Sequence, residues 1–355
     1  MRHIFKAIFC LMMIAAIQAT TFGQIAYSLT DNNRDVTGLD QQYYQFDLST
    51  GTGTLITNLV VNGQQIRREY EGLASIGSTL YAVSEFDTET CNTGSDPITG
   101  LAADLRKFRV PGTYPAANGV ASAIGPQVGE TCFPSGYTES AAAYNPNDGW
   151  IYAIASDDTL PAGDIRSGLY RVSPSTGLAT LVGNNASPTA PGSTARGVIK
   201  TAACTGVNVP NLCSAGGEEN PYIDGLAILP DGRIYGSAAR LNDNGAFHGG
   251  MYRIFATGVN AGRAQWIGYL YNGTDLNQDT GLANSGNTLY MILELGPTLW
   301  TLPNVTPQAF GAPSDARAVA AVFPGGGNTM TAPGCLRLPV CGDFEGFDIP
   351  VLQLR

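Results

Sequence analysis

Apolar and polar positions along the chain form short alternating runs, a pattern typical of β-strands. Five runs carry a tyrosine among aliphatic residues, and each is followed by a second strand-like run. The best copies of that second run align residue by residue, YQFDLSTG at 44–51 with YRVSPSTG at 170–177. The tyrosines of the first runs are Tyr27, Tyr81, Tyr152, Tyr235 and Tyr290. The chain therefore contains a repeat built from groups of short strands.

Two further strands complete each copy of the repeat. One follows the second run, and in the fifth copy residues 318–323 are its best candidate. The other precedes the tyrosine run and reads EGLA at 71–74, ESAA at 139–142, DGLA at 224–227 and TGLA at 280–283. The first copy has no such preceding strand, and EGFD at 345–348 has no blade of its own. We expect the C-terminal strand to complete the first copy.

This organisation predicts an all-β fold, a five-bladed β-propeller of four-stranded antiparallel blades. A single blade cannot cover both of its faces, so the blades stack in a ring, and the C-terminal strand joins the N-terminal blade to close it. We expect residues 24–355 to form this one domain. The repeated aromatic and aliphatic side chains are interpreted as packing between blades.

Connections of different length are predicted on the two faces of the ring. The turns after the first strand of each blade are short, whereas the long segments include 85–104, 183–223, 238–250 and 324–344. In this topology the long segments emerge together on one face. Because binding residues usually lie on loops held by a rigid scaffold, we expect this loop-rich face to be the functional one.

Composition removes several classes of protein. With 44 Gly, 21 Pro and 14% charged residues, the chain is unlike a helical or coiled-coil protein, and its 44% hydrophobic residues argue against disorder. Acidic residues outnumber basic ones 29 to 19, so no nucleic-acid partner is expected.

The N-terminus resembles a secretory signal peptide. Arg2 and Lys6 precede an apolar run at 7–17 and a short polar stretch, which predicts removal of residues 1–23, with cleavage after Ala19 as the second choice. A membrane anchor is the alternative, but spanning needs about 20 apolar residues. We expect a secreted or cell-surface protein that does not insert into the membrane.

Six cysteines remain after removal of the leader, and an even number in an exported chain predicts disulfides. Proximity in sequence favours two local pairs and one longer one, and zinc is the alternative, although no CxxC spacing occurs. The residues are Cys91, Cys132, Cys204, Cys213, Cys335 and Cys341.

Acidic residues recur at the start of the first strand of the blades, where the strand lines the channel. Carboxylates that converge need a cation or shared protons, so a bound Ca²⁺ is one interpretation. The alternative is that each acid caps backbone N–H groups of the next blade or meets water. The candidate residues are Glu71, Glu139, Asp224, Asp279 and Glu345.

Two D-x-N-x-D motifs add candidate calcium ligands, although the Asn and Asp chemistry of turns is the favoured explanation. Their residues are Asp31, Asn33, Asp35, Asp275, Asn277 and Asp279. Nucleophilic catalysis has little support, because His248, predicted in a loop, is the one histidine beyond the leader.

Residues 168–183, GLYRVSPSTGLATLVG, resemble the repeats of secreted bacterial β-propellers of unknown function. A weaker similarity links the Glu-Gly pairs at 71–72 and 345–346 to gluconolactonase-type propellers, whose family places a Glu of an E-G-P motif on a central divalent metal. Here Leu73 and Phe347 replace that proline, and those enzymes have six blades. Five-bladed glycosidases resemble the chain by blade number alone.

We therefore expect a monomeric binding module whose loop-rich face, stapled by disulfides and stabilised by Ca²⁺, takes a glycan or protein. The alternative is a metal-dependent hydrolase of a sugar lactone, glycoside or phosphoester that uses the channel carboxylates. Whether the protein is an enzyme is left open, with a binder favoured.

Overall fold

The computed structural model describes the strands and the shorter connections of the chain. The described residues are 25–30, 42–48, 52–58, 60–61, 64–65, 70–77, 79–84, 104–109, 124–131, 133, 139–157, 166–183, 200–201, 223–243, 246–258, 261–270, 280–293, 298–302, 328–329 and 344–350.

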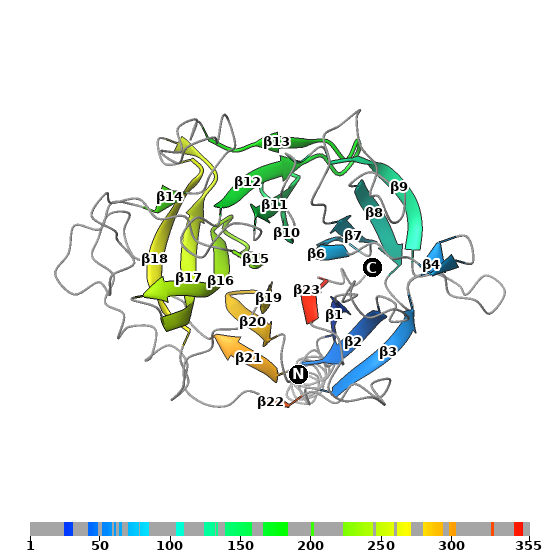
Figure 1. Ribbon diagram of the computed structural model, residues 1–355. Helices are drawn as coiled ribbons and strands as arrows, with labels where there is room; N and C mark the ends of the chain where they lie inside the picture. The colour runs from blue at the N-terminus through cyan, green and yellow to red at the C-terminus, as the bar shows by residue number, and fades with distance from the viewer. Residues whose placement is uncertain are drawn as a thin grey trace, which may run out of the picture.

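Short strands form sheets arranged as a β-propeller around a central axis (Figure 1). The first sheet, in spatial order, comprises β23 (Phe344–Asp348), β1 (Ile25–Thr30), β2 (Gln42–Asp47) and β3 (Thr52–Asn58). The second comprises β6 (Tyr70–Ile76), β7 (Thr79–Ser84), β8 (Asp104–Arg109) and β9 (Ile124–Glu130). The third comprises β10 (Glu139–Asn145), β11 (Trp150–Asp157), β12 (Arg166–Val172) and β13 (Ala179–Leu181).

The remaining sheets complete the ring. One comprises β15 (Gly225–Ile228), β16 (Ile234–Asp243), β17 (Ala246–Phe255), β18 (Arg263–Tyr269) and β14 (Lys200–Thr201). The last blade comprises β19 (Thr280–Ser285), β20 (Thr288–Leu293), β21 (Thr298–Leu302) and β22 (Asn328–Thr329). A separate ribbon pairs β4 (Val60–Val61) with β5 (Gln64–Gln65).

The number of blades differs from the prediction. Four sheets are four-stranded and antiparallel as expected, but the sheet of β15 to β18 has a fifth strand, β14, which runs parallel to β18. The structure therefore shows four blades of the predicted type and not five. The cause is the long connection after β13, part of which returns to the outer edge of this sheet, where unpaired backbone groups are available.

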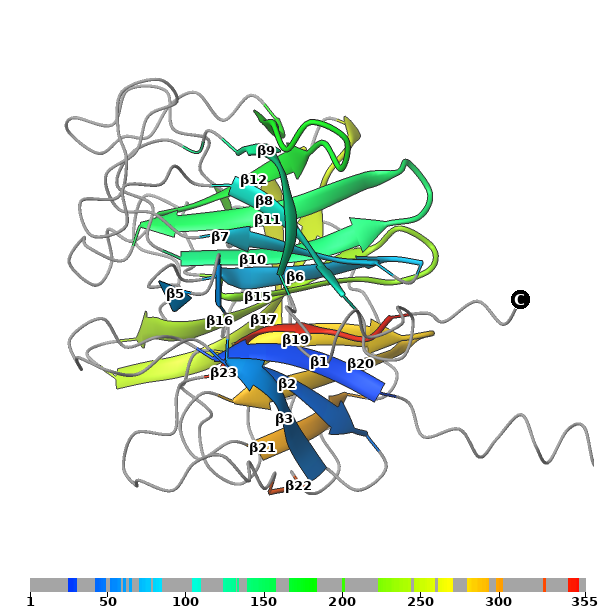
Figure 2. The same ribbon diagram turned by 90° about the vertical axis from the view of Figure 1, so that its right-hand side faces the viewer.

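The C-terminal strand closes the ring as predicted. β23 pairs antiparallel with β1, so that Tyr27 lies opposite Asp348 and Ser28 opposite Phe347. Phe344 is fully buried and packs edge-on against Tyr44 and Phe46, with ring centroids 5.2 Å and 5.4 Å apart. Figure 2 shows β23 between β1 and β19, which confirms that the chain end joins the first and last blades.

Apolar side chains fill the spaces between neighbouring blades. One buried cluster joins Tyr152 and Ile154 of β11 to Leu226 of β15 and Ile254 of β17, and the other clusters likewise join neighbouring sheets. Alternating strands place one residue in two towards each neighbouring blade, so the ring buries both faces of the sheets. The interpretation of the repeated aromatic residues as packing between blades is confirmed.

Tight turns join the first two strands of four sheets, as expected. Gly149 and Gly232 occupy these turns with φ of 79° and 83°, a left-handed backbone that favours glycine. The turns lie at the same end of the channel, which we call the turn-side end. The opposite end, where the innermost strands begin near Glu71 and Asp224, is the loop-side end.

One detail of the strand prediction is wrong, and another lies outside the described residues. The predicted loop at 238–250 is largely strand, because β16 and β17 continue as a long hairpin in which His248 lies opposite Leu241. β22 pairs with β21 in the last blade, whereas the candidate strand at 318–323 lies outside the described residues. Residues 1–23 lie outside them as well, and no helix in the described part of the chain is long and apolar enough to cross a membrane.

Candidate functional site

The innermost strands β6, β10, β15, β19 and β23 surround the axis (Figure 1). At the loop-side end they approach one another closely at glycines. A Cβ on Gly346 would lie 2.0 Å from the carbonyl oxygen of Glu71, and one on Gly225 would lie 2.8 Å from that of Thr280. Real side chains do not tolerate such distances, so the recurring Gly after the acidic residue is explained by close packing of neighbouring inner strands.

Asp224 is held by the next blade at this end. Its Oδ2 accepts a hydrogen bond of 3.1 Å from the backbone N–H of Thr280, and its Oδ1 accepts one of 3.1 Å from the Thr280 hydroxyl. Thr280 also contacts the Ser237 hydroxyl through a hydrogen bond. A carboxylate removed from water needs such donors, and Asp224 acts as a cap on β19. This is the alternative to metal binding that the sequence left open.

Glu71 and Asp224 are both buried and line one small cavity on the axis. The cavity measures about 10 Å³, which is close to the space that one water molecule needs. The loop-side end of the channel is thus nearly closed by the inner strands.

The predicted metal ligands are only partly described. Glu139 begins β10 and Glu345 lies in β23, and the placement of their side chains is not described. Among the described residues, no three His, Cys, Asp or Glu side chains form a group that could hold a metal. The remaining candidates lie outside the described residues: Asp31, Asn33, Asp35, Asp275, Asn277, Asp279, Cys91, Cys132, Cys204, Cys213, Cys335 and Cys341.

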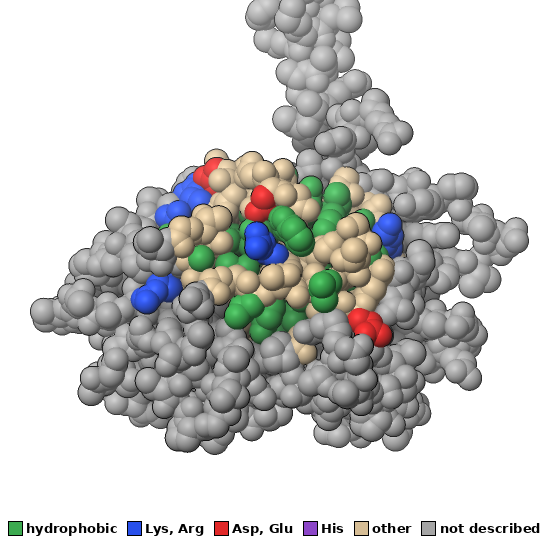
Figure 3. Space-filling model, turned by 90° about the horizontal axis from the view of Figure 1, so that it is seen from above, with side chains coloured by type: hydrophobic (Ala, Val, Ile, Leu, Met, Phe, Trp, Pro, Cys, Tyr) green, Lys and Arg blue, Asp and Glu red, His purple; other side chains and the backbone are tan. Residues whose placement is uncertain are grey.

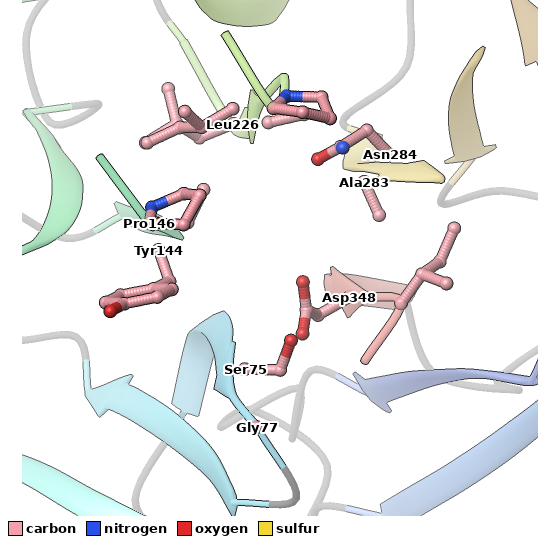
Figure 4. A pocket seen from close by; sticks show the side chains of 13 residues that line it. Ser75, Gly77, Tyr144, Pro146, Leu226, Ala283, Asn284 and Asp348 are labelled. Atoms are coloured by element: carbon pink, nitrogen blue, oxygen red, sulfur yellow. The ribbon is translucent and has the colours of Figure 1, made fainter. Parts of the chain in front are cut away.

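The turn-side end of the channel opens into a pocket of about 330 Å³, which we call the axial pocket. Its walls are mainly apolar and come from the ends of the inner strands and the tight turns that follow them (Figure 4). The described lining residues are Ser75, Gly77, Ala143, Tyr144, Pro146, Leu226, Ala227, Ile228, Pro230, Ala283, Asn284, Asp348 and Ile349.

Asp348 supplies the carboxylate of the axial pocket. It accepts hydrogen bonds from the Ser75 hydroxyl and from the backbone N–H groups of Ser75 and Ile349, but its buried Oδ2 has no partner among the described residues. Figure 4 shows the carboxylate projecting into the pocket with the Ser75 hydroxyl beside it. Burial raises the pKa of Asp348 to about 7, and the hydrogen bonds only partly offset this effect.

The groups around Asp348 do not neutralise its charge. Tyr43, across β1, has a pKa well above its usual value because it is buried and lies near Tyr27 and Asp348. Burial raises the pKa of Tyr27 to about 12. Both phenols are neutral at pH 7, and none of the described residues that line the pocket is Lys, Arg or His. A single unbalanced carboxylate thus faces an apolar cavity.

Sequence reasoning missed Asp348, although the repeat contains a signal for it. In the alignment of EGFD with EGLA, ESAA, DGLA and TGLA, the position of Asp348 is alanine in every other copy. In the structure, Asp348 pairs with Tyr27, and the residues that pair with the tyrosines of the other sheets are buried alanines: Ala74, Ala143, Ala227 and Ala283. The closing strand therefore places a carboxylate where the repeat otherwise has a small apolar side chain.

Figure 3 shows one side of the ring, where the described hydrophobic, basic and acidic side chains lie in small separate groups without a large patch of one charge sign. Leu178 is the one large hydrophobic side chain among the described residues that is exposed, at 50%. The axial pocket is therefore the best candidate site in the described part of the chain.

Comparisons with known proteins find distant structural similarity only. No family model and no curated protein matches the sequence. Propeller-type structures match at low similarity: a Bacteroides uniformis protein provisionally assigned as a 6-phosphogluconolactonase has 14% identity and a TM-score of 0.33. An endo-arabinase of Bacteroides thetaiotaomicron has 13% identity and a TM-score of 0.44, and TolB of Acinetobacter baumannii 11% and 0.37.

The matches extend over most of this chain. They cover 81%, 82% and 82% of it for the Bacteroides uniformis protein, the endo-arabinase and TolB. The matched part of this chain spans 65%, 92% and 65% of those proteins, so about a third of two of them has no counterpart in this chain. Similarity at this level says nothing about what the chain binds or catalyses.

Proposed function

We propose that this chain is a β-propeller binding module and that its ligand occupies the axial pocket. The observation that carries the proposal is Asp348, a carboxylate that lines the pocket at a position that is alanine in the other copies of the repeat. Placing a charge in an apolar pocket costs stability unless a partner arrives. The cavity of about 330 Å³ falls at the lower end of the range for small-molecule sites.

Binding is favoured over hydrolysis by the number of carboxylates in the pocket. Cleavage of a glycoside normally uses two carboxyl groups on opposite sides of the scissile bond. Among the described residues that line the axial pocket, Asp348 is the one acid. The hydrolase alternative has its candidate acids at the loop-side end, where Asp224 is occupied by hydrogen bonds to Thr280.

This proposal moves the site to the face opposite the one expected from the sequence. The long connections that carry the cysteines lie outside the described residues, so a disulfide-stapled loop face with a glycan or protein ligand stays a prediction, as do secretion and the monomeric state. We propose these properties alongside the pocket. We also propose calcium at the loop-side end, beside Glu71 and Asp224, because acidic residues recur at the start of the inner strands.

The proposal is tested by filling the pocket. Asn284 lines it from a partly exposed position in β19, so Asn284→Trp is expected to occupy the cavity without disturbing the core. A set of small fragments is screened by ligand-detected NMR against the wild type and the variant. Compounds that bind the wild type should lose binding in Asn284→Trp.

Leu178→Trp is the matched control, because Leu178 is exposed and does not line the pocket. Fragment binding should survive in it. Fragments that bind Asn284→Trp as well as they bind the wild type would place the site elsewhere, and the proposal would fail.

A further inference from the structure

We infer that the axial pocket selects small organic cations, in which an ammonium group pairs with Asp348 and an apolar body fills the cavity. The inference rests on the proposed function and names the ligand class for the same pocket. The first step is charge. Asp348 is the one charged side chain among the described residues that line the pocket.

The second step is the nature of the walls. Leu226, Ile228, Pro146, Pro230 and Ala283 offer no hydrogen-bonding side chain, and the polar side chains besides Asp348 and Ser75 are those of Tyr144 and Asn284. A sugar or a peptide would leave several of its polar groups without partners against these residues. A ligand with one donor group and a hydrocarbon body meets both parts of the pocket.

The third step is the choice between a cationic and a neutral donor. A charge-assisted hydrogen bond to a carboxylate is about twice as strong as a neutral one, and a low-polarity pocket strengthens it further. The neighbours of Asp348 on β1 and β2 are the neutral phenols of Tyr27 and Tyr43, so no protein cation competes with the ligand in the described part of the site. Ser75 holds the carboxylate in place through its hydroxyl.

The direction of the pH dependence follows from the same groups. An ammonium needs Asp348 ionised, and the pKa of this carboxyl is raised to about 7. Binding of the cation should therefore strengthen as pH rises from about 6 to about 8, where the amine itself stays protonated. A neutral ligand that accepts a hydrogen bond from the protonated carboxyl of Asp348 would show the opposite trend.

The experiment compares two ligands of nearly equal size, benzylamine and benzyl alcohol, by isothermal titration calorimetry at pH 8. We expect the amine to bind the wild type at least about tenfold more tightly than the alcohol. Asp348→Asn should remove this preference and leave the affinity for the alcohol within about threefold. Asp148→Asn, which removes a charge from an exposed turn at the same end, should keep the preference.

The outcomes separate the two proposals. Equal affinity for both ligands in the wild type, with binding lost in Asn284→Trp, would overturn the cation inference and leave the pocket as the binding site. Failure of both ligands, together with failure of every fragment in the NMR screen, would overturn both. A preference for the amine that persists in Asp348→Asn would also overturn the inference, because the charge would then come from another group.

Discussion

The two ends of the central channel are built from the same inner strands and yet differ in what they can do. At the loop-side end, glycines let neighbouring strands approach until the space between them holds about one water, and Asp224 finds its donors on the next blade. At the turn-side end the strands diverge towards their turns, the cavity widens to about 330 Å³, and Asp348 keeps an oxygen without a partner among the described residues. An acid in a repeat is thus structural where the next blade satisfies it and available where it does not.

The largest expected effect is the pH dependence of stability that the buried carboxyl of Asp348 causes at the turn-side end. The folded-state pKa of Asp348, about 7, lies above the ordinary value of 3.8, so its favourable contribution is complete below pH 3.8 and is lost as pH rises through 7. Wild-type stability should fall relative to Asp348→Asn across this window by up to about 1.4 kcal/mol per pH unit. Urea unfolding of both proteins from about pH 4 to about pH 8 measures it. Parallel curves would mean that the carboxyl is not desolvated.

Overpacking the inner strands at the loop-side end should lower the free energy of unfolding by nearly as much as ionisation of Asp348. Gly346→Val would place side-chain atoms against the Glu71 carbonyl, and overpacking of this kind costs about 3 kcal/mol. The free energy of unfolding in urea measures the loss. Gly286→Asn is the control, since nothing lies within 4 Å of a Cβ there and Asn tolerates the φ of 59°. A loss in Gly286→Asn as large as that in Gly346→Val would show that close approach is not the reason for Gly346.

Removal of the cap at the same end should have a smaller effect. Asp224→Ala leaves the N–H and hydroxyl of Thr280 without their acceptor, which costs about 2 kcal/mol. Thermal unfolding measures the change, and Thr280→Val provides a second reading of the same contact. If Asp224→Ala is as stable as the wild type, the carboxylate is not a cap, and the metal interpretation of this end gains support.

Calcium should have the smallest effect on stability, if it binds at the loop-side end as predicted. At a concentration tenfold above Kd, a bound ion adds about 1.4 kcal/mol. Melting in millimolar Ca²⁺ should then rise above melting in equal Mg²⁺, and Glu71→Gln combined with Glu139→Gln should remove the difference. Identical melting in the two ions would end the calcium prediction.

Much of the architecture could be predicted because the repeat acts locally. The tyrosine runs, the Gly-containing turns and the lone EGFD strand indicated antiparallel blades and closure of the ring, and β23 pairs with β1 as expected. The prediction of five four-stranded antiparallel blades was wrong, because β14 adds to a sheet edge from a connection with no strand-like repeat. The long hairpin that carries His248 was missed because its alternation departs from the other copies.

The candidate site could be predicted only in part. The pattern identified Glu71 and Asp224 as neighbours on the axis, and the structure brings both to one cavity. Capping of the next blade was one of the two interpretations of these acids, and the structure identifies Thr280, 56 positions away, as the partner of Asp224. Asp348 was visible as the odd member of an alanine column, but a departure from a repeat has no meaning until its surroundings are known.

The sequence by itself determined the strands, their order within the blades and the closing role of the C-terminus, since alternation, turns and repeats depend on residues close together in the chain. Only the tertiary structure decided which end of the channel is open. That depends on how closely inner strands from different blades approach, at Gly346 against Glu71 and at Asp348 beside Ser75, and on which carboxylates meet donors there. Burial and hydrogen bonding across blades therefore set the chemistry of Asp224 and Asp348, two acids that lie in different copies of the same repeated strand.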